Sequence, residues 1–256
     1  MLLKSFYLAV GIQAAFGIPG VLSKSERFYD FSGALTHIAL ALYSIKSPLT
    51  TQKIIGNAIS VGWALRLGGF LAYRMYKSGS DTRFDDIKQS KLRFASAWFI
   101  QAIWCTLIQS PLILMNAYSP VKTLGTLDKV LAAGWVGSVI LEATADIQKY
   151  LYKQNRKESD PGFTNVGLWK YSQHPNYFFE MTTWAFAWMY CCRHLPTKHG
   201  LYGLSSPLFT TFILLFVSGI PHSKTPEKYG KDPRYQVYEK STSTLIPWFP
   251  SAIKRD

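Results

Sequence analysis

Seven stretches of the chain have the apolar pattern of membrane-spanning helices. Three contain no Asp, Glu, Lys or Arg, and four carry isolated charges or are shorter. The first group covers residues 5–23, 94–121 and 200–223, and the second covers 31–45, 53–74, 129–149 and 175–193. An apolar helix of about 20 residues crosses the hydrocarbon core of a bilayer. The pattern therefore predicts an all-α polytopic membrane bundle of about seven transmembrane helices, organised as one integral-membrane domain over residues 1–256.

Basic residues gather between these stretches in a way that predicts the topology. Residues 74–93, 148–170 and the polar tail 224–256 carry six, five and seven Lys or Arg residues, which is 18 of the 28. An even number of predicted spans separates any two of these segments. All three can therefore face the cytosol, as the positive-inside preference requires, with the N-terminus outside and the C-terminus inside.

Composition narrows the classes of protein that remain. Hydrophobic residues make up 48% of the chain and charged residues only 17%, against about 25% charged in an average soluble domain, which excludes a disordered chain. The mean hydropathy of +0.04 averages the apolar stretches with the basic ones. Because the net charge of +13 mostly sets orientation, we expect membrane lipids and no nucleic acid as partners. A few of these cations can serve an anion site.

The first apolar stretch fits two interpretations. Lys4 followed by the apolar residues 6–10 also suits a signal peptide. Gln13, Pro19 and the lack of a small-residue cleavage site favour a retained first helix.

Metal and disulfide chemistry lack their ligands in the sequence. The histidines show no HxxxH, HxxH or HExxH spacing, which metal-dependent desaturases or proteases would need. Cys105, Cys191 and Cys192 form no CxxC pair. We therefore expect no metal site and interpret the cysteines as apolar packing residues.

Polar side chains interrupt three of the apolar stretches at helical spacing. Residues four or eight apart lie on one helix face, and ionisable groups within a membrane are costly and mostly functional. The pairs are Glu142 with Asp146, Asn176 with Glu180, and Arg66 with Arg74. Two interpretations stay open. The pairs converge on a ligand cavity open to the cytosolic side, or they form salt bridges that hold the bundle together.

Tyrosines and cations alternate in the tail. Tyr229, Tyr235 and Tyr238 lie among five Lys and Arg residues between positions 224 and 240, and residues 245–250 turn apolar again. This composition is typical of an aromatic belt at a membrane surface. It equally suits a phosphorylated aromatic cofactor, since Lys and Arg bind phosphates and Tyr stacks.

A longer pattern carries a resemblance to a known family. The run from Gly167 to Glu180, GLWKYSQHPNYFFE, followed by Trp184, resembles the signature of the steroid 5-alpha-reductase C-terminal superfamily, and most closely its uncharacterised multi-span branch. Gln173 stands where that branch has Arg, and Phe179 where it has Gly. Further matching segments are Arg66, residues 68–71, Arg74, 81–85, Gln101, Pro111, 142–149, 218–221 and 235–247, so that the resemblance covers about residues 66–250.

The resemblance implies a helical membrane reductase. Its members take NADPH from the cytosolic side and reduce a carbon–carbon double bond conjugated to a carbonyl in a hydrophobic, lipid-like or steroid-like substrate. The cofactor-binding residues that it implies are Arg74, Arg83, Glu142, Asp146, Asn176, Tyr177, Glu180, Tyr235 and Tyr238, with the two arginines on the phosphates. No GxGxxG follows a strand, so the cofactor would lie between helices. The endoplasmic reticulum membrane is the location expected for a eukaryotic member.

The expected proton donor is replaced in this chain. Leu71 occupies the position at which steroid-reducing relatives carry a tyrosine, three residues before Arg74, and we find no counterpart of their N-terminal glutamate. Tyr73 and Tyr177 are the catalytic candidates, and Tyr76 is a further substitute. Two alternatives remain open: an isoprenylcysteine-type methyltransferase that uses S-adenosylmethionine, and a non-catalytic lipid-binding membrane protein.

Overall fold

The computed structural model describes residues 1–217, 219–223 and 225–251, without the side chains of Thr82 and His222. Ser218 of the resembling segment 218–221 and Lys224 of the tail lie outside the described residues. Within the described residues the chain is about three-quarters helix and contains no strand. The predicted all-α class is confirmed.

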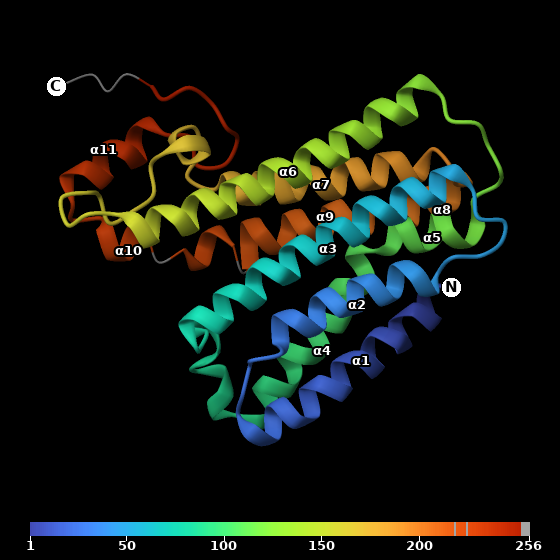
Figure 1. Ribbon diagram of the computed structural model, residues 1–256, viewed down its shortest axis with the longest axis horizontal. Coiled ribbons are helices and arrows are strands. Elements are labelled where there is room, and N and C mark those ends of the chain that lie inside the picture. The colour runs from blue at the N-terminus through green and yellow to red at the C-terminus, as the bar shows by residue number, and fades with distance from the viewer. Residues whose placement is uncertain (218, 224, 252–256) are drawn as a thin grey trace. The chain divides into compact units, whose positions relative to one another are not determined.

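Figure 1 shows the helices in chain order. The α-helices are α1 Leu2–Ser23, α2 Tyr29–Tyr43, α3 Thr51–Ser78, α4 Lys91–Ile108, α5 Ser110–Tyr118, α6 Thr126–Asn155, α7 Pro175–Cys192, α8 Thr197–Gly203, α9 Ser205–Phe212, α10 Thr225–Tyr229 and α11 Pro233–Ser241. The short helical turns are η1 Thr82–Phe84, η2 Ile87–Gln89, η3 Gly167–Lys170, the π-helical η4 Ile213–Val217, and η5 Ile220–His222.

Each of the seven apolar stretches forms helix, but not each forms one long helix. By length and composition, α1, α3, α6 and the run Thr197–Val217 can cross a membrane, and the bent pair α4–α5 makes a fifth span if it is counted as one. Helix α2 has 15 residues, which is shorter than the roughly 20 that a full crossing takes. The chain therefore has the helices of an integral membrane protein, with four or five spans by these criteria.

The stretch 94–121 was expected to form a single span and is bent. α4 ends at Ile108 and α5 begins at Ser110, with an angle of 51° between them. Pro111 stands in the first turn of α5. A proline ring clashes with the preceding helical turn and lacks the N–H that would continue it, which explains why the helix breaks here.

The chain divides into two compact units. Unit 1 comprises residues 1–133 and 185–207, and unit 2 comprises residues 134–184 and 208–256. The boundaries fall inside α6, α7 and α9, so these helices contribute residues to both units.

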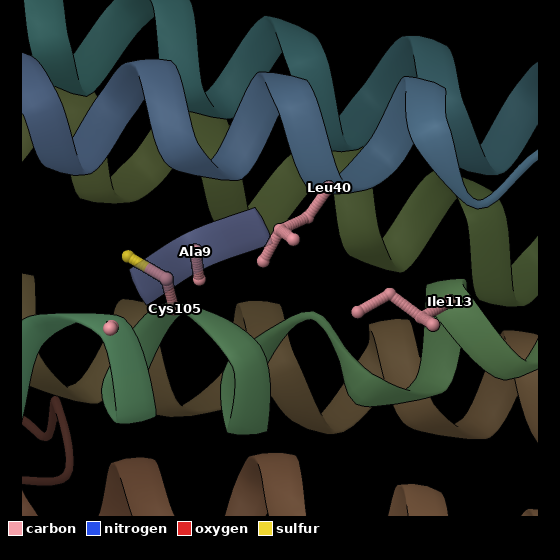
Figure 2. Packing of buried hydrophobic residues seen from close by; sticks show 5 residues of the cluster. Ala9, Leu40, Cys105 and Ile113 are labelled. Atoms are coloured by element: carbon pink, nitrogen blue, oxygen red, sulfur yellow. The ribbon is translucent and has the colours of Figure 1, made fainter. Parts of the chain in front are cut away.

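Close helix contacts form the core of unit 1. α1 packs on α4 and α2, and α2 packs on α3. Figure 2 shows Ala9, Leu40, Cys105 and Ile113 gathered between α1, α2, α4 and α5. At the α2–α3 contact, a Cβ on Gly68 would meet the Cβ of Ala34. Small residues such as Gly68 let helix backbones approach closely.

Buried amides connect the helices of unit 1 by hydrogen bonds. Asn116 of α5 bonds to Asn57 of α3 at 2.8 and 3.1 Å and donates to Ser44 Oγ at 2.9 Å. Gln13 of α1 donates to Thr36 Oγ1 of α2 at 2.8 Å. Such side chains act as polar links between helices where water is absent.

Glycines on α1 offer a matched test of this packing. A Cβ on Gly17 would lie 2.8 Å from Trp98 Cγ on α4, whereas a Cβ on Gly11 meets nothing within 4 Å. Both substitutions to alanine favour the helix, so their difference isolates the clash. We expect the free energy of unfolding in detergent to be about 1–3 kcal/mol lower for Gly17→Ala than for Gly11→Ala, which thermal unfolding shows as a lower unfolding temperature. Equal unfolding temperatures would show that the α1–α4 contact is looser than the structure has it.

Candidate functional site

The polar residues predicted on α6 and α7 meet in unit 2. Asn176 Nδ2 donates to Asp146 Oδ1 at 3.2 Å. The other amide atom, Asn176 Oδ1, is buried and accepts no hydrogen bond from the described residues. Glu142 is buried one helical turn before Asp146, and Glu180 lies one turn after Asn176, half-buried. The i, i+4 spacing of each pair is therefore realised as a helix face.

Trp169 is held from three directions beside this pair. Its indole N–H donates to the carbonyl of Ala145 on α6 at 2.8 Å, and its own carbonyl accepts from Tyr238 Oη of α11 at 2.6 Å. The ammonium of Lys149 lies 4.4 Å from the centre of its ring, which is a cation–π contact. The turn η3 that carries Trp169 starts at Gly167, whose φ of 58° is a conformation that glycine adopts without steric cost.

Aromatic rings of the tail pack around Phe163. The ring centres of Tyr229, Tyr235 and Tyr238 lie 6.1, 5.1 and 5.2 Å from that of Phe163. Tyr235 is almost completely buried. Burial, together with the neighbouring Glu239, raises the pKa of Tyr235 to about 12, and burial raises that of Tyr238 as well. Both phenols therefore stay protonated and act as hydrogen-bond donors at neutral pH.

These elements enclose a cavity of about 210 Å³ in unit 2. Its lining combines cations, aromatic rings and hydrogen-bonding side chains, and none of the described residues that line it is a carboxylate. The cations are Lys149, Lys153 and Lys228, the aromatic side chains are Phe163, Trp169, Tyr177, Tyr229, Tyr235 and Tyr238, and the other polar side chains include Thr164, Gln173 and His174. Among the predicted site residues, the cavity is thus lined by Tyr177, Tyr235 and Tyr238.

One buried hydroxyl in this lining lacks a partner. Thr164 is 7% exposed, and its Oγ1 makes no hydrogen bond to the described residues. A buried polar group without a partner costs about 1–3 kcal/mol. A ligand that supplies a donor or acceptor within the cavity would remove this cost.

His174 is fixed in one orientation at the cavity wall. Its Nδ1 lies 3.1 Å from the carbonyl oxygen of Thr244, and its ring stacks on Tyr177 with 5.4 Å between centres. Because a carbonyl only accepts, Nδ1 carries a proton. Burial lowers the pKa of His174; the hydrogen bond to Thr244 opposes this, and the charge of Lys149 adds to the lowering. The ring is therefore neutral at pH 7, with Nε2 as an acceptor.

The predicted residues of the N-terminal half belong to unit 1. Arg83 forms ion pairs with Asp30 at 3.1 Å and Asp81 at 2.6 Å, and Arg74 pairs with Asp81 at 3.4 Å. Burial opposes ionisation of Asp81, but the hydrogen bonds and charge of Arg83 outweigh it and lower the pKa of Asp81. Tyr73 is exposed on α3, with the Lys77 ammonium 5.8 Å from its ring centre.

The cavity is also lined by residues that no sequence pattern identified as site residues. Phe163 and Thr164 follow the charged segment after α6 and carry no motif of their own. Lys228 and Tyr229 belong to the tail pattern in which a cofactor platform and an aromatic belt could not be separated. Lys153 had no signal beyond its place in a basic segment. Among the described residues no three His, Cys, Asp or Glu side chains gather as a metal ion would need.

Comparison with known proteins gives one match. The model of a family described as "Protein of unknown function (DUF1295)" matches residues 16–242. The matched region begins well before Arg66, the residue from which the sequence resemblance runs. No curated protein and no solved structure matches the chain.

The unpartnered hydroxyl gives a stability prediction with an internal control. Thr183 on α7 is also buried in unit 2 with an unpartnered Oγ1, and it does not line the cavity. Valine keeps the shape of threonine and removes the hydroxyl. We expect Thr164→Val and Thr183→Val each to raise the free energy of unfolding of the ligand-free protein by about 1 kcal/mol, measured by thermal unfolding. A loss of stability at Thr164 alone would mean that its hydroxyl has a partner.

Proposed function

Because the chain belongs to the DUF1295 family, which is associated with steroid 5-alpha-reductase-like proteins, we propose that it is a membrane-embedded NADPH-dependent reductase. Its substrate is a lipid-like or steroid-like molecule with a carbon–carbon double bond conjugated to a carbonyl. The observation that carries the proposal is the cavity of unit 2, with its three lysines, its aromatic walls and the unpartnered hydroxyl of Thr164.

The chemistry of the lining fits one end of this cofactor. A volume of about 210 Å³ is below the roughly 300–1,000 Å³ of a pocket for a whole drug-sized ligand, so the cavity takes a part of a dinucleotide. Ammonium groups bind phosphate as point charges, and tyrosine rings stack on a purine. Lys153, Lys228 and Tyr229 would hold the phosphorylated adenosine end, and Thr164 would bond to it.

The lysines suit phosphate better than the arginines that the resemblance implies. Arg74 and Arg83 are engaged by Asp30 and Asp81 in unit 1, so their charge is already balanced. Lys153 and Lys228 face a lining in which no described residue is a carboxylate. An anion entering this cavity therefore meets net positive charge.

Asp146 on α6 and Asn176 on α7 do not line the cavity, and we assign them to the other, nicotinamide end of the cofactor. A carboxylate such as Asp146 accepts hydrogen bonds from ribose hydroxyls, and the buried Oδ1 of Asn176 can accept from a carboxamide. His174 Nε2 is a further acceptor at the cavity wall. When bound, NADPH supplies the hydride for the electron-poor carbon of the substrate.

Reduction of such a double bond also needs a donor to the substrate carbonyl. Hydrogen bonding to that oxygen stabilises the negative charge that develops on it. Tyr177 is the better of the two tyrosine candidates, because it follows directly after Asn176, which we assign to the nicotinamide end, and stacks on His174. Tyr73 is exposed on α3 beside Lys77.

The proposal extends to topology. α2 and α7 would complete seven spans, the cavity would open to the cytosol where NADPH is available, and in a eukaryotic cell the membrane would be the endoplasmic reticulum. The apolar helices support a membrane location, and the three basic segments support this orientation.

The charge of the cavity argues against the methyltransferase alternative. S-adenosylmethionine carries a sulfonium cation, and three lysines line the cavity. Like charges within a partly buried site repel, so this ligand would bind poorly.

A ligand screen tests the cofactor assignment. Purified protein in detergent is heated with NADPH, NADH or S-adenosylmethionine, since a ligand that binds only the folded state stabilises it by mass action. We expect NADPH at about 100 times its dissociation constant to add about 2.7 kcal/mol and S-adenosylmethionine to add nothing. Stabilisation by S-adenosylmethionine alone would overturn the reductase proposal, and no response to any of the three would favour a non-catalytic protein.

Substitutions at the polar pair complete that experiment. Asp146→Ala and Asn176→Ala should each abolish the response to NADPH while the protein still folds. Asp146→Asn keeps the size of the side chain and should also lose the response. If these variants instead fail to fold, the pair has the structural role of the salt-bridge interpretation.

Lysine substitutions test whether a lysine of the cavity binds a phosphate of NADPH. Lys228 lines the cavity with its ammonium 5.3 Å from the ring centre of Tyr229, whereas Lys231 is exposed outside it. We expect Lys228→Gln to weaken NADPH binding about 10-fold, the size of one hydrogen bond between charged groups, and to change NADH binding little. Lys231→Gln is the matched control. Equal weakening of NADPH by both variants in a titration would show only a general effect of charge.

A further inference from the structure

The last described segment of the chain is tied to the cavity wall by consecutive hydrogen bonds. Residues 242–251, which we term the C-terminal strap, run beside residues 171–174. The bonds are Gln173 N to Ser243 O at 2.9 Å, Gln173 Nε2 to Thr242 O at 2.8 Å, His174 Nδ1 with Thr244 O at 3.1 Å, Ser172 Oγ to Leu245 O at 2.7 Å, and Trp248 N to Tyr171 O at 2.9 Å. The strap is therefore an ordered part of unit 2.

Large apolar side chains project from this ordered strap. Ile246, Trp248 and Phe249 are 60%, 71% and 75% exposed. Phe249 contacts the ring of Tyr171 at 5.8 Å between centres, edge to face. Burying three such side chains in an apolar environment is worth several kcal/mol in total, so an uncovered patch of this kind marks an interaction surface.

Charge and backbone chemistry indicate what covers the patch. Exposed Lys170 and Lys240 stand one residue from the strap's contacts at Tyr171 and Ser241, and no Asp or Glu occurs between residues 240 and 251. Tryptophan beside lysine is the composition found where protein meets lipid headgroups. Cations here would also be attracted to anionic lipids.

The backbone of the strap suits a place at the edge of a membrane. Irregular backbone enters an apolar region only if its polar groups have partners. Pro247 and Pro250 have no N–H, Trp248 N bonds to Tyr171, and the carbonyl of Leu245 accepts from Ser172. Three of the five positions from 246 to 250 thus offer no free N–H that would oppose insertion.

We propose that the C-terminal strap is an interfacial anchor, which inserts Ile246, Trp248 and Phe249 into the boundary between headgroups and acyl chains of the bilayer. The anchor is a membrane contact additional to the spanning helices. Because the strap also bonds to Gln173 and His174, which line the cavity, contact with lipid holds this wall of the cavity in place. The proposal does not depend on which ligand the cavity takes.

A site-specific probe tests the anchor directly. The full chain with Phe249→Cys carries an environment-sensitive NBD fluorophore, in a Cys192→Ser background because Cys192 is the half-exposed cysteine. The protein is placed in nanodiscs of phosphatidylcholine with or without phosphatidylserine. Lys231→Cys, at an exposed polar position, is the control. We expect quenchers on lipid acyl chains to reduce the signal at residue 249 several-fold more than at residue 231, and aqueous iodide to do the reverse. Equal quenching at both positions overturns the proposal.

A second measurement avoids the label at Phe249. Hydrogen exchange of residues 242–251 is compared in nanodiscs for the wild-type chain and for Trp248→Ser with Phe249→Ser. The anchor predicts faster exchange in the double variant, both in the strap and in residues 171–174, with unchanged protection in α1–α3. Unchanged exchange in the strap overturns it. Protection found only in nanodiscs that hold two copies also overturns it, because a second copy would then cover the patch.

Discussion

The hydrogen bonds that fix Trp169 hold together the parts of the chain that form the site of unit 2. Its indole N–H is bound to the carbonyl of Ala145 on α6, and its carbonyl is bound by Tyr238 on α11. A loop residue thus connects a long helix of the bundle to the tail. Lys149, stacked over the ring at 4.4 Å, takes its position in the cavity from the same contact. Together with the hydrogen bonds from Leu168 N to Gln148 and from Tyr152 to Pro161, this fixation sets the spacing between the aromatic wall of the tail and the cationic end of α6.

The length of α6 explains how lysines can line a cavity in a membrane protein. Thirty residues make a helix of about 45 Å, against a hydrocarbon core of about 30 Å. With the apolar first part of α6 in that core, the last turns, which carry Lys149 and Lys153, would extend beyond it. Their charges then avoid the cost of a position at the bilayer centre. Trp169 and the tail lie near the same end of the helix, where water and a charged ligand would then have access.

Patterns of local spacing predicted the helices and the polar pair, but not the cavity. Asp146 and Asn176 could be foreseen, because each is one of two polar residues on an apolar helix face. The break at Gln109 followed from Pro111, a signal present in the sequence but outweighed there by the unbroken apolar run. The cavity instead depends on chain segments far apart, since Phe163 meets tyrosines more than 60 residues later. Sequence periodicity does not predict contacts between such distant segments. A buried threonine such as Thr164 cannot be distinguished from other loop residues until its surroundings are known.

Two basic clusters in the same chain differ in how their charge is balanced, and this difference distinguishes a structural role from a binding role. In unit 1, Arg74 and Arg83 meet Asp30 and Asp81, and Lys88 meets Glu26 at 2.8 Å. Those cations are satisfied within the fold. In unit 2, Lys153 and Lys228 line a cavity in which no described lining residue is a carboxylate, while the hydroxyl of Thr164 stays unpartnered. A packing role gives no reason to bring Lys153 and Lys228 to one cavity, because their charges repel. An external anion resolves both features at once, which is why the cavity, and not the arginine cluster, is the stronger candidate for the phosphates of a cofactor.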